Sequence, residues 1–182
     1  MRYQRTNVEG STYFFTLVTE RRRPLFRGPK EVALFDDAIA KVRQRFPFEI
    51  VAQVVLPDHV HTVWTLPLSD ANFPLRLGLI KEAFTRAYLR DNPAPVASPA
   101  RRARREQGIW QRRFWEHLIR DDRDLAAHVD YIHLNPVHHG YAAAPRDWPY
   151  STFPDWVARG VYETAWGSDE KPGLPDWAKR HE

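Results

Sequence analysis

Two short stretches of the sequence combine residue types that bind metal ions and attack phosphate esters. The first is His59-Val60-His61, set between two apolar runs. Side chains alternate faces along a β-strand, so both imidazoles point to one surface, where they can chelate one cation. The second stretch runs from Tyr131 to Asn135 inside a predicted helix. Residues four apart share a helical face, so this phenol and this carboxamide point the same way.

Two histidines and one amide form a donor set of three neutral ligands. Such a set leaves coordination positions open for water and for a phosphate oxygen, which suits a hard divalent ion, Mg²⁺ or Mn²⁺. A structural zinc site would instead be closed by four protein ligands. We therefore expect His59, His61 and Asn135 to be the ligands of a catalytic metal.

Tyr131 is the candidate nucleophile. A phenol is protonated below a pKa of about 10 and attacks poorly, but a cation on the phosphate makes the phosphorus easier to attack. The product would be a phosphotyrosine, which retains the energy of the broken phosphodiester for a later rejoining. Taken singly, a histidine pair on a strand and a tyrosine on a helix are more often structural; it is their combination that favours strand transfer.

The charge of the chain is divided along its length. Residues 1–120 carry 21 Lys or Arg against 12 Asp or Glu, a net +9, whereas residues 121–182 carry 6 against 11, a net −5. Of the 27 basic residues 22 are arginine, which grips phosphate and stacks on bases, although a GC-rich genome would give the same bias. A polyanion would lie on the first two thirds, and we expect it to be single-stranded DNA.

The basic candidates for DNA contacts fall in four places. Arg21 and Arg22 follow the first predicted strand, Lys81 lies on a helix, and a segment rich in proline carries a cluster of four arginines. The fourth place mixes aromatic and basic residues, as stacking on single-stranded bases requires. The alternative for the basic segments is a loop that is merely solvated, and the alternative for the tryptophan is burial in the core. The candidates are Arg21, Arg22, Lys81, Arg101, Arg102, Arg104, Arg105, Arg112, Arg113 and Trp115.

Periodicity predicts the elements that must position these residues. Aromatic and β-branched runs indicate strands, and apolar residues three and four apart indicate amphipathic helices. Pro57-Asp58 is a tight connection that makes its flanking strands an antiparallel pair, and Pro136 is expected to end the last helix. The predicted strands are 13–19, 48–56, 60–66 and 114–119, and the predicted helices 31–46, 73–90 and 123–135.

Length and composition predict one compact domain with a tail. We place the domain at residues 1–145 and an irregular tail rich in Trp and Pro at 146–182. The absence of cysteine excludes disulfides and thiolate catalysis. No apolar run is long enough for a membrane span and no apolar leader follows Met1, so we expect a cytoplasmic, nucleoid-associated bacterial protein.

Four motifs resemble, in order, those of the REP-associated tyrosine transposases. These are bacterial relatives of the single-tyrosine insertion-sequence transposases, within the HUH endonuclease superfamily. The resemblance covers roughly residues 8–157 and rests on Leu56 to His61, Gly108 to His117, Asp130 to Val137 with Gly140, and Trp148 to Ser151.

The resemblance implies an α+β fold, with a ferredoxin-like antiparallel sheet packed against helices. It also implies cleavage and rejoining of single-stranded DNA at REP-type hairpins. By position, His59 and His61 would hold the metal, Tyr131 would form a 5′-phosphotyrosine, and Asn135, where related transposases have glutamine, would be the third ligand.

We expect no small-molecule substrate, and we expect the protein to be a monomer or a homodimer. The alternatives are a module that binds hairpins without cutting them and a replication initiator or relaxase, which usually carries extra domains.

Overall fold

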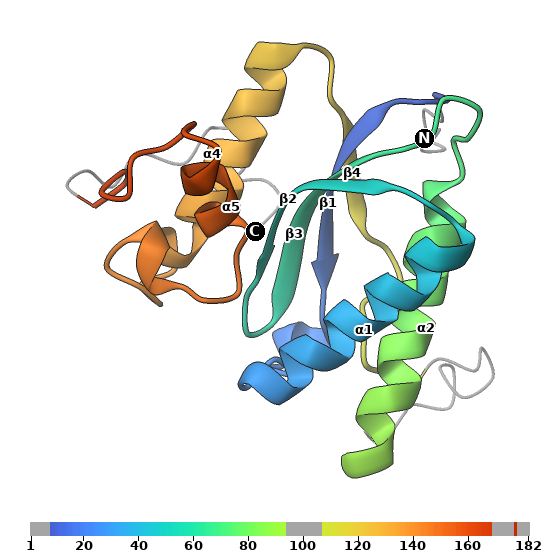
Figure 1. Ribbon diagram of the computed structural model, residues 1–182. Helices are drawn as coiled ribbons and strands as arrows, with labels where there is room; N and C mark the ends of the chain where they lie inside the picture. The colour runs from blue at the N-terminus through green and yellow to red at the C-terminus, as the bar shows by residue number, and fades with distance from the viewer. Residues whose placement is uncertain (1–7, 94–106, 169–176, 178–182) are drawn as a thin grey trace.

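The computed structural model describes residues 8–93, 107–168 and Trp177 (Figure 1). The four motifs of the sequence all lie in these ranges. The elements are, in chain order, β1 (Thr12–Val18), η1 (Glu20–Arg22), α1 (Pro29–Arg45), β2 (Glu49–Val55), β3 (His59–Thr65), α2 (Phe73–Asp91), β4 (Trp115–Leu118), α4 (Asp122–His138), η2 (Pro145–Asp147) and α5 (Phe153–Ala158).

The four strands form one antiparallel sheet in the order β2-β3-β1-β4. The succession of β1, α1, β2, β3, α2 and β4 in this order is the ferredoxin-like arrangement, so the predicted α+β fold is confirmed. The register between the two central strands places Thr16 opposite His61 and Val18 opposite His59. The histidine motif therefore lies on a central strand.

Alternation along β3 divides the molecule into two layers on opposite faces of the sheet. Val60 and Trp64 are buried in the cluster formed with α1 and α2, whereas Val63 belongs to the cluster formed with α4. Figure 1 shows α1 and α2 together on one side of the sheet and α4 on the other. His59 and His61 share the face of Val63 because they lie four and two residues away from it, respectively. Both imidazoles therefore point toward α4, the helix that contains Tyr131.

The helix α4 continues past Pro136, which corrects the expectation that proline ends it. Pro136 has no N–H to donate to the preceding turn, but the next turn closes without it. His139 N donates to Asn135 O at 3.1 Å. The helix ends at His138, and Gly140, whose φ of 72° is in the left-handed region, follows the C-cap and donates its N–H to Val137 O at 3.0 Å. Asn135 therefore lies within a regular turn of the helix.

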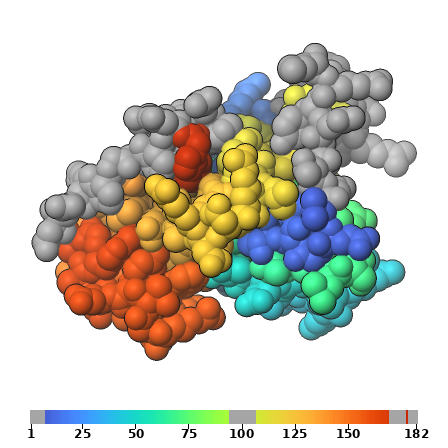
Figure 2. All heavy atoms as spheres, turned by 90° about the horizontal axis from the view of Figure 1, so that it is seen from above, coloured from blue at the N-terminus to red at the C-terminus, as the bar shows by residue number. Residues whose placement is uncertain are grey.

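The segment after Gly140 packs along the outer edge of β2. Trp148 Nε1 donates to Val55 O at 3.0 Å, and Trp156 Nε1 donates to Val51 O at 2.9 Å. These bonds satisfy carbonyls on an edge strand that would otherwise be open to pairing. Figure 2 shows this segment, in orange, beside the yellow surface of α4. It contains the short helices η2 and α5, and the expected boundary at residue 146 stays a prediction.

None of the described helices is both long enough and apolar enough to cross a membrane.

Candidate active site

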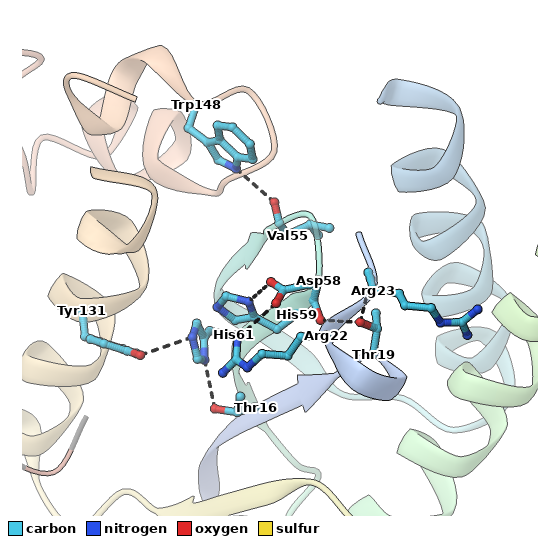
Figure 3. A network of polar contacts seen from close by, with 10 residues as sticks. All are labelled: Thr16, Thr19, Arg22, Arg23, Val55, Asp58, His59, His61, Tyr131 and Trp148. Carbon is cyan, nitrogen blue, oxygen red and sulfur yellow. Dashed lines mark hydrogen bonds and ion pairs between the residues drawn. The ribbon is translucent and has the colours of Figure 1, made fainter. Parts of the chain in front are cut away.

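The two histidines of β3 are held side by side in the layer beneath α4. Both side chains are 1% exposed, and their ring centroids lie 4.8 Å apart. Asp58 Oδ1 lies 2.6 Å from Nδ1 of His59, and Thr16 Oγ1 lies 2.9 Å from Nδ1 of His61 (Figure 3). Partners at Nδ1 fix the orientation of each ring and leave Nε2 as the atom that can bind a cation.

Tyr131 reaches this pair from α4. Its Oη lies 3.3 Å from Nε2 of His61, so the phenol and the imidazole contact each other across the interface between helix and sheet (Figure 3). The ring of Tyr131 is only 3% exposed. The predicted convergence of a distant phenol on the histidine motif is therefore present in the fold.

Two of the three predicted metal ligands have polar atoms that are buried without a hydrogen-bond partner among the described residues. They are Nε2 of His59 and both amide atoms of Asn135, which is fully buried. An unsatisfied buried polar group costs about 1–3 kcal/mol, and a bound ion or water is one way to satisfy it. An imidazole nitrogen and an amide oxygen are ligands that a divalent cation accepts, and the residues present fit one.

The protonation states favour metal binding as well. Burial lowers the pKa of His61 well below its usual value, and the charges of His59, His139 and Arg22 lower it further. His61 is therefore a neutral imidazole with a free lone pair, as a metal ligand must be. Burial alone would raise the pKa of Asp58, but the hydrogen bond with His59 and the ion pair with Arg22 hold it below the usual range. Asp58 is thus an anion that orients His59.

Arg22 approaches the pair from a loop with an unusual backbone. Arg21 and Arg22 have φ of 57° and 49°, and left-handed backbone costs a residue with a side chain roughly 1–2 kcal/mol. Nη1 of Arg22 donates to Asp58 Oδ2 at 3.1 Å, while Oδ1 of the same carboxylate binds His59. The Arg22 guanidinium thereby lies next to the histidines (Figure 3).

A second group of potential ligands joins β4 to the first two turns of α4. Nε2 of His117 lies 2.8 Å from Asp124 Oδ2, Nδ1 of His128 lies 3.1 Å from Asp124 Oδ1, and the three ligand atoms are within 4.8 Å of one another. The two imidazole planes are stacked at 13° with centroids 4.6 Å apart. Their lone pairs therefore lie in two nearly parallel planes, which does not favour a shared cation between them. This group is better described as a hydrogen-bonded trio around Asp124 than as a metal centre.

Comparison with known proteins decides the family. The REP-associated tyrosine transposase of Escherichia coli K12 is 42% identical over 167 residues, which cover 92% of this chain and 91% of that protein. The chain belongs to the REP-associated tyrosine transposases. A Haemophilus influenzae protein assigned to the same family is also 42% identical, over 92% of this chain and 93% of its own length. No family model matches the chain.

A solved structure supports the same assignment. A REP-associated tyrosine transposase bound to a REP hairpin superposes with a TM-score of 0.77 at 42% identity, over 93% of this chain and 92% of that one. The family consists of tyrosine transposases, which are DNA endonucleases and strand transferases. The enzyme class expected from the sequence is therefore confirmed.

Aromatic rings cover the tyrosine of this transposase. The indole of Trp177 stacks on His128 with centroids 4.1 Å apart and meets the Tyr131 ring edge-on at 5.0 Å. Trp115 is half-buried and lies parallel to His117 and to Trp177, at 5.9 and 6.3 Å. Any DNA that reaches the Tyr131 hydroxyl must displace or rearrange part of this covering.

The other candidates for DNA contacts are spread more widely. Lys81 lies on α2, on the face of the sheet opposite to Tyr131, and its Nζ donates to Gln111 O at 2.6 Å. Arg112 and Arg113 are exposed just before β4. The cluster of Arg101, Arg102, Arg104 and Arg105 lies outside the described residues. Among the basic candidates that the structure describes, only Arg22 contacts Asp58, the residue directly before the histidine motif.

Sequence reasoning gave no role to three residues beside the histidines. Thr16 contacts His61 across the β1–β3 pair, and Asp58 orients His59. His139 lies just beyond α4, with its ring centroid 5.1 Å from that of His59. The position of Asp58 directly before His59 was a usable signal. Nothing in the sequence marked Thr16, because its role depends on strand register.

Proposed function

We propose that this transposase binds DNA hairpins of the REP type and cleaves and rejoins single-stranded DNA next to them through a 5′-phosphotyrosine on Tyr131. The observation that carries the proposal is the contact at 3.3 Å between the Tyr131 hydroxyl and Nε2 of His61. It brings a nucleophile to the nitrogen that is available to a cation. The solved relative bound to a REP hairpin supports the choice of DNA partner.

The chain's own residues account for the transfer. Tyr131 Oη forms a bond to phosphorus, the bond from phosphorus to the 3′ oxygen breaks, and the phenol proton leaves to solvent. The departing 3′ oxygen takes a proton from water and becomes a hydroxyl. Because one phosphodiester replaces another, the same hydroxyl can later attack the phosphotyrosine and restore the strand. A Mg²⁺ or Mn²⁺ ion held by His59, His61 and Asn135 would supply positive charge at a phosphoryl oxygen.

A suicide substrate tests the proposal. A hairpin oligonucleotide with a single-stranded flank is nicked so that the departing fragment diffuses away, which traps the protein–DNA adduct. The wild type should form the adduct in Mg²⁺ or Mn²⁺, and Tyr131→Phe should form none while still binding the hairpin. Tyr88→Phe, on the buried face of α2, is the matched control and should react as the wild type does. An adduct that persists in Tyr131→Phe would refute the assigned nucleophile.

The covering of Tyr131 by Trp177 favours a second candidate, a protein that binds hairpins and cuts little or not at all. Tight hairpin binding without an adduct in either ion would support it.

As further parts of the main proposal, the protein acts on DNA in the bacterial cytoplasm, as a monomer or a homodimer, and residues 1–145 form its nuclease domain.

A further inference from the structure

The loop after β1 holds two adjacent residues in a conformation that side chains disfavour. Arg21 and Arg22 both have positive φ, at 57° and 49°. Glycine adopts this backbone without strain, yet both positions carry long side chains. Strain of this kind persists only where the surroundings impose it, and it concentrates at functional sites. The strained backbone therefore indicates a function for the side chains of this loop.

The surroundings that impose the strain are well defined. Thr19, which is fully buried, donates from both its N–H and its hydroxyl to Asp58 O, each at 2.9 Å. Glu20 N donates to Ile109 O at 2.8 Å, and the Arg23 guanidinium binds Gly108 O. The loop is thus fastened on one side to the residue that precedes the histidine motif and on the other to the chain leading to β4.

The fastened loop sets the position of one side chain. Arg22 is 37% exposed, and its Nη1 donates to Asp58 Oδ2 at 3.1 Å. The other oxygen of that carboxylate binds His59, so a single anion holds both the arginine and the metal-binding imidazole. In Figure 3 the Arg22 guanidinium lies beside His61, with Tyr131 on the other side of that ring.

We infer that Arg22 is a catalytic residue that binds a nonbridging oxygen of the scissile phosphate and stabilises the negative charge that develops there, an inference that rests on the proposed function. A guanidinium has five N–H donors in a planar fork, so one edge can hold Asp58 while another meets the phosphate. Attack by Tyr131 adds charge to the nonbridging oxygens, which a fixed cation stabilises more strongly as bond formation proceeds. Arg22 acts alongside the metal ligands and takes no part in proton transfer.

The test compares single-turnover adduct formation on the hairpin oligonucleotide at saturating DNA and saturating Mn²⁺. Removal of one such donor typically slows the chemical step about 10²-fold, and we expect this for Arg22→Ala, with hairpin affinity changed less than about threefold. Arg22→Lys keeps the charge without the fork and should recover only part of the rate. Arg27→Ala removes an exposed arginine from the following loop as the charge-matched control and should react normally.

Two further measurements separate a catalytic contact from a role in holding Asp58. The first replaces each nonbridging oxygen of the scissile phosphate with sulfur. Arg22→Ala should change the ratio of rates for the two diastereomers, whereas a merely structural residue would leave it unaltered. The second uses Arg22→Gly, which suits the left-handed backbone. It should match the wild type in Tm or exceed it, and yet be as slow as Arg22→Ala.

Each contrary result has a separate meaning. If the wild type forms an adduct and Arg22→Ala matches its rate, or regains it when Mn²⁺ is raised above the concentration that saturates the wild type, Arg22 serves only to hold Asp58 and the inference is wrong. An unchanged diastereomer ratio would lead to the same conclusion. If the wild type itself forms no adduct, the proposed function fails and takes this inference with it.

Discussion

At the scale of single residues, each imidazole of the site is oriented by a different kind of partner. His59 is held by the carboxylate of the preceding residue, in the connection between β2 and β3, whereas His61 is held by a hydroxyl on the paired strand. An anion at Nδ1 makes an imidazole a stronger ligand than a neutral hydroxyl does. The two ligands should therefore respond differently when their partners are removed.

Thr16→Val tests the weaker of these partners. Valine has nearly the shape of threonine but leaves Nδ1 of His61 without its contact, which is 2.9 Å in the wild type. Loss of such an orienting group usually lowers metal affinity about 10–100-fold. Calorimetric titration of the DNA-free protein with Mn²⁺ measures it, and Thr12→Val, at the far end of the same strand, is the control. Equal affinity in the wild type and Thr16→Val would show that strand packing alone orients the ring.

His59→Ala should separate cleavage from recognition. The imidazole is 1% exposed and cannot be an extensive contact for a hairpin, yet its Nε2 is one of the three expected metal ligands. We expect no detectable cleavage and nearly unchanged hairpin affinity by fluorescence anisotropy. A parallel loss of binding would contradict the assigned role and indicate that His59 supports the DNA surface itself.

The sequence contained enough to propose the residues of the candidate site but not their partners. His59 and His61, and likewise Tyr131 and Asn135, follow from local periodicity, which survives any tertiary arrangement. Thr16 and the left-handed Arg21 and Arg22 do not, because cross-strand register and loop strain depend on contacts between distant parts of the chain.

At the scale of elements, α4 places Tyr131 next to the histidines because it packs on the sheet face that bears both of them. The helix was predicted to end at Pro136, and that error came from treating proline as a stop signal. Proline breaks a helix when the missing hydrogen bond and the ring clash are not offset by packing. Here Pro136 is buried, as are its neighbours Asn135 and Val137, so tertiary contacts keep the turn intact. Such packing could not be inferred from local sequence.

His133 on α4 makes the stability of this interface dependent on pH. Nε2 of His133 lies 3.0 Å from Thr152 Oγ1, which joins the helix to the segment along β2. Burial lowers the pKa of His133 to about 3. Below a pH of about 6.5, His133 is protonated in the unfolded chain but stays neutral in the folded protein. The free energy of unfolding therefore falls as pH drops from about 6.5 toward the folded pKa.

Urea denaturation at several pH values measures this dependence. Each such group contributes a slope of up to about 1.4 kcal/mol per pH unit in that window. His133→Gln retains an amide that can contact Thr152 but does not titrate, so its free energy of unfolding should fall less steeply than that of the wild type. His61 and His128, whose pKa values burial also lowers, remain in both proteins and cancel in the comparison. Equal slopes in the two proteins would show that unfolding adds no proton to His133, so that its pKa is not lowered in the folded protein.

The edge of β2 offers a second prediction at this scale. Trp156→Phe keeps most of the ring but removes the N–H that binds Val51 O at 2.9 Å. A lost hydrogen bond of this kind costs about 1 kcal/mol, and a shift of about 2–4 °C in Tm follows for a protein of this size. Val157→Ala, on the same short helix and half-buried, serves as the control for volume. An unchanged Tm would mean that water replaces the indole at the carbonyl.

At the scale of the whole molecule, charge and fold divide the chain differently. The first 120 residues carry +9 and the last 62 carry −5, yet Tyr131, the proposed nucleophile, lies in the acidic part. The arrangement of the sheet resolves this, because α4 packs against β3, which belongs to the basic part. A hairpin held by the basic two thirds can therefore present its single-stranded flank to Tyr131.

Replacement of Arg101, Arg102, Arg104 and Arg105 by alanine tests where that positive charge acts. If each contacts one phosphate of duplex DNA, the slope of log Kd against log salt should fall by up to about 0.9 per arginine, and affinity should drop most at low salt. Anisotropy titrations from low to physiological salt give both quantities. Arg123→Ala with Arg159→Ala removes exposed charge from the acidic third and should leave the slope nearly unchanged. If the quadruple variant keeps the wild-type slope, these arginines do not touch phosphate, and the hairpin must be held by other basic residues of the first 120, such as Arg112 and Arg113.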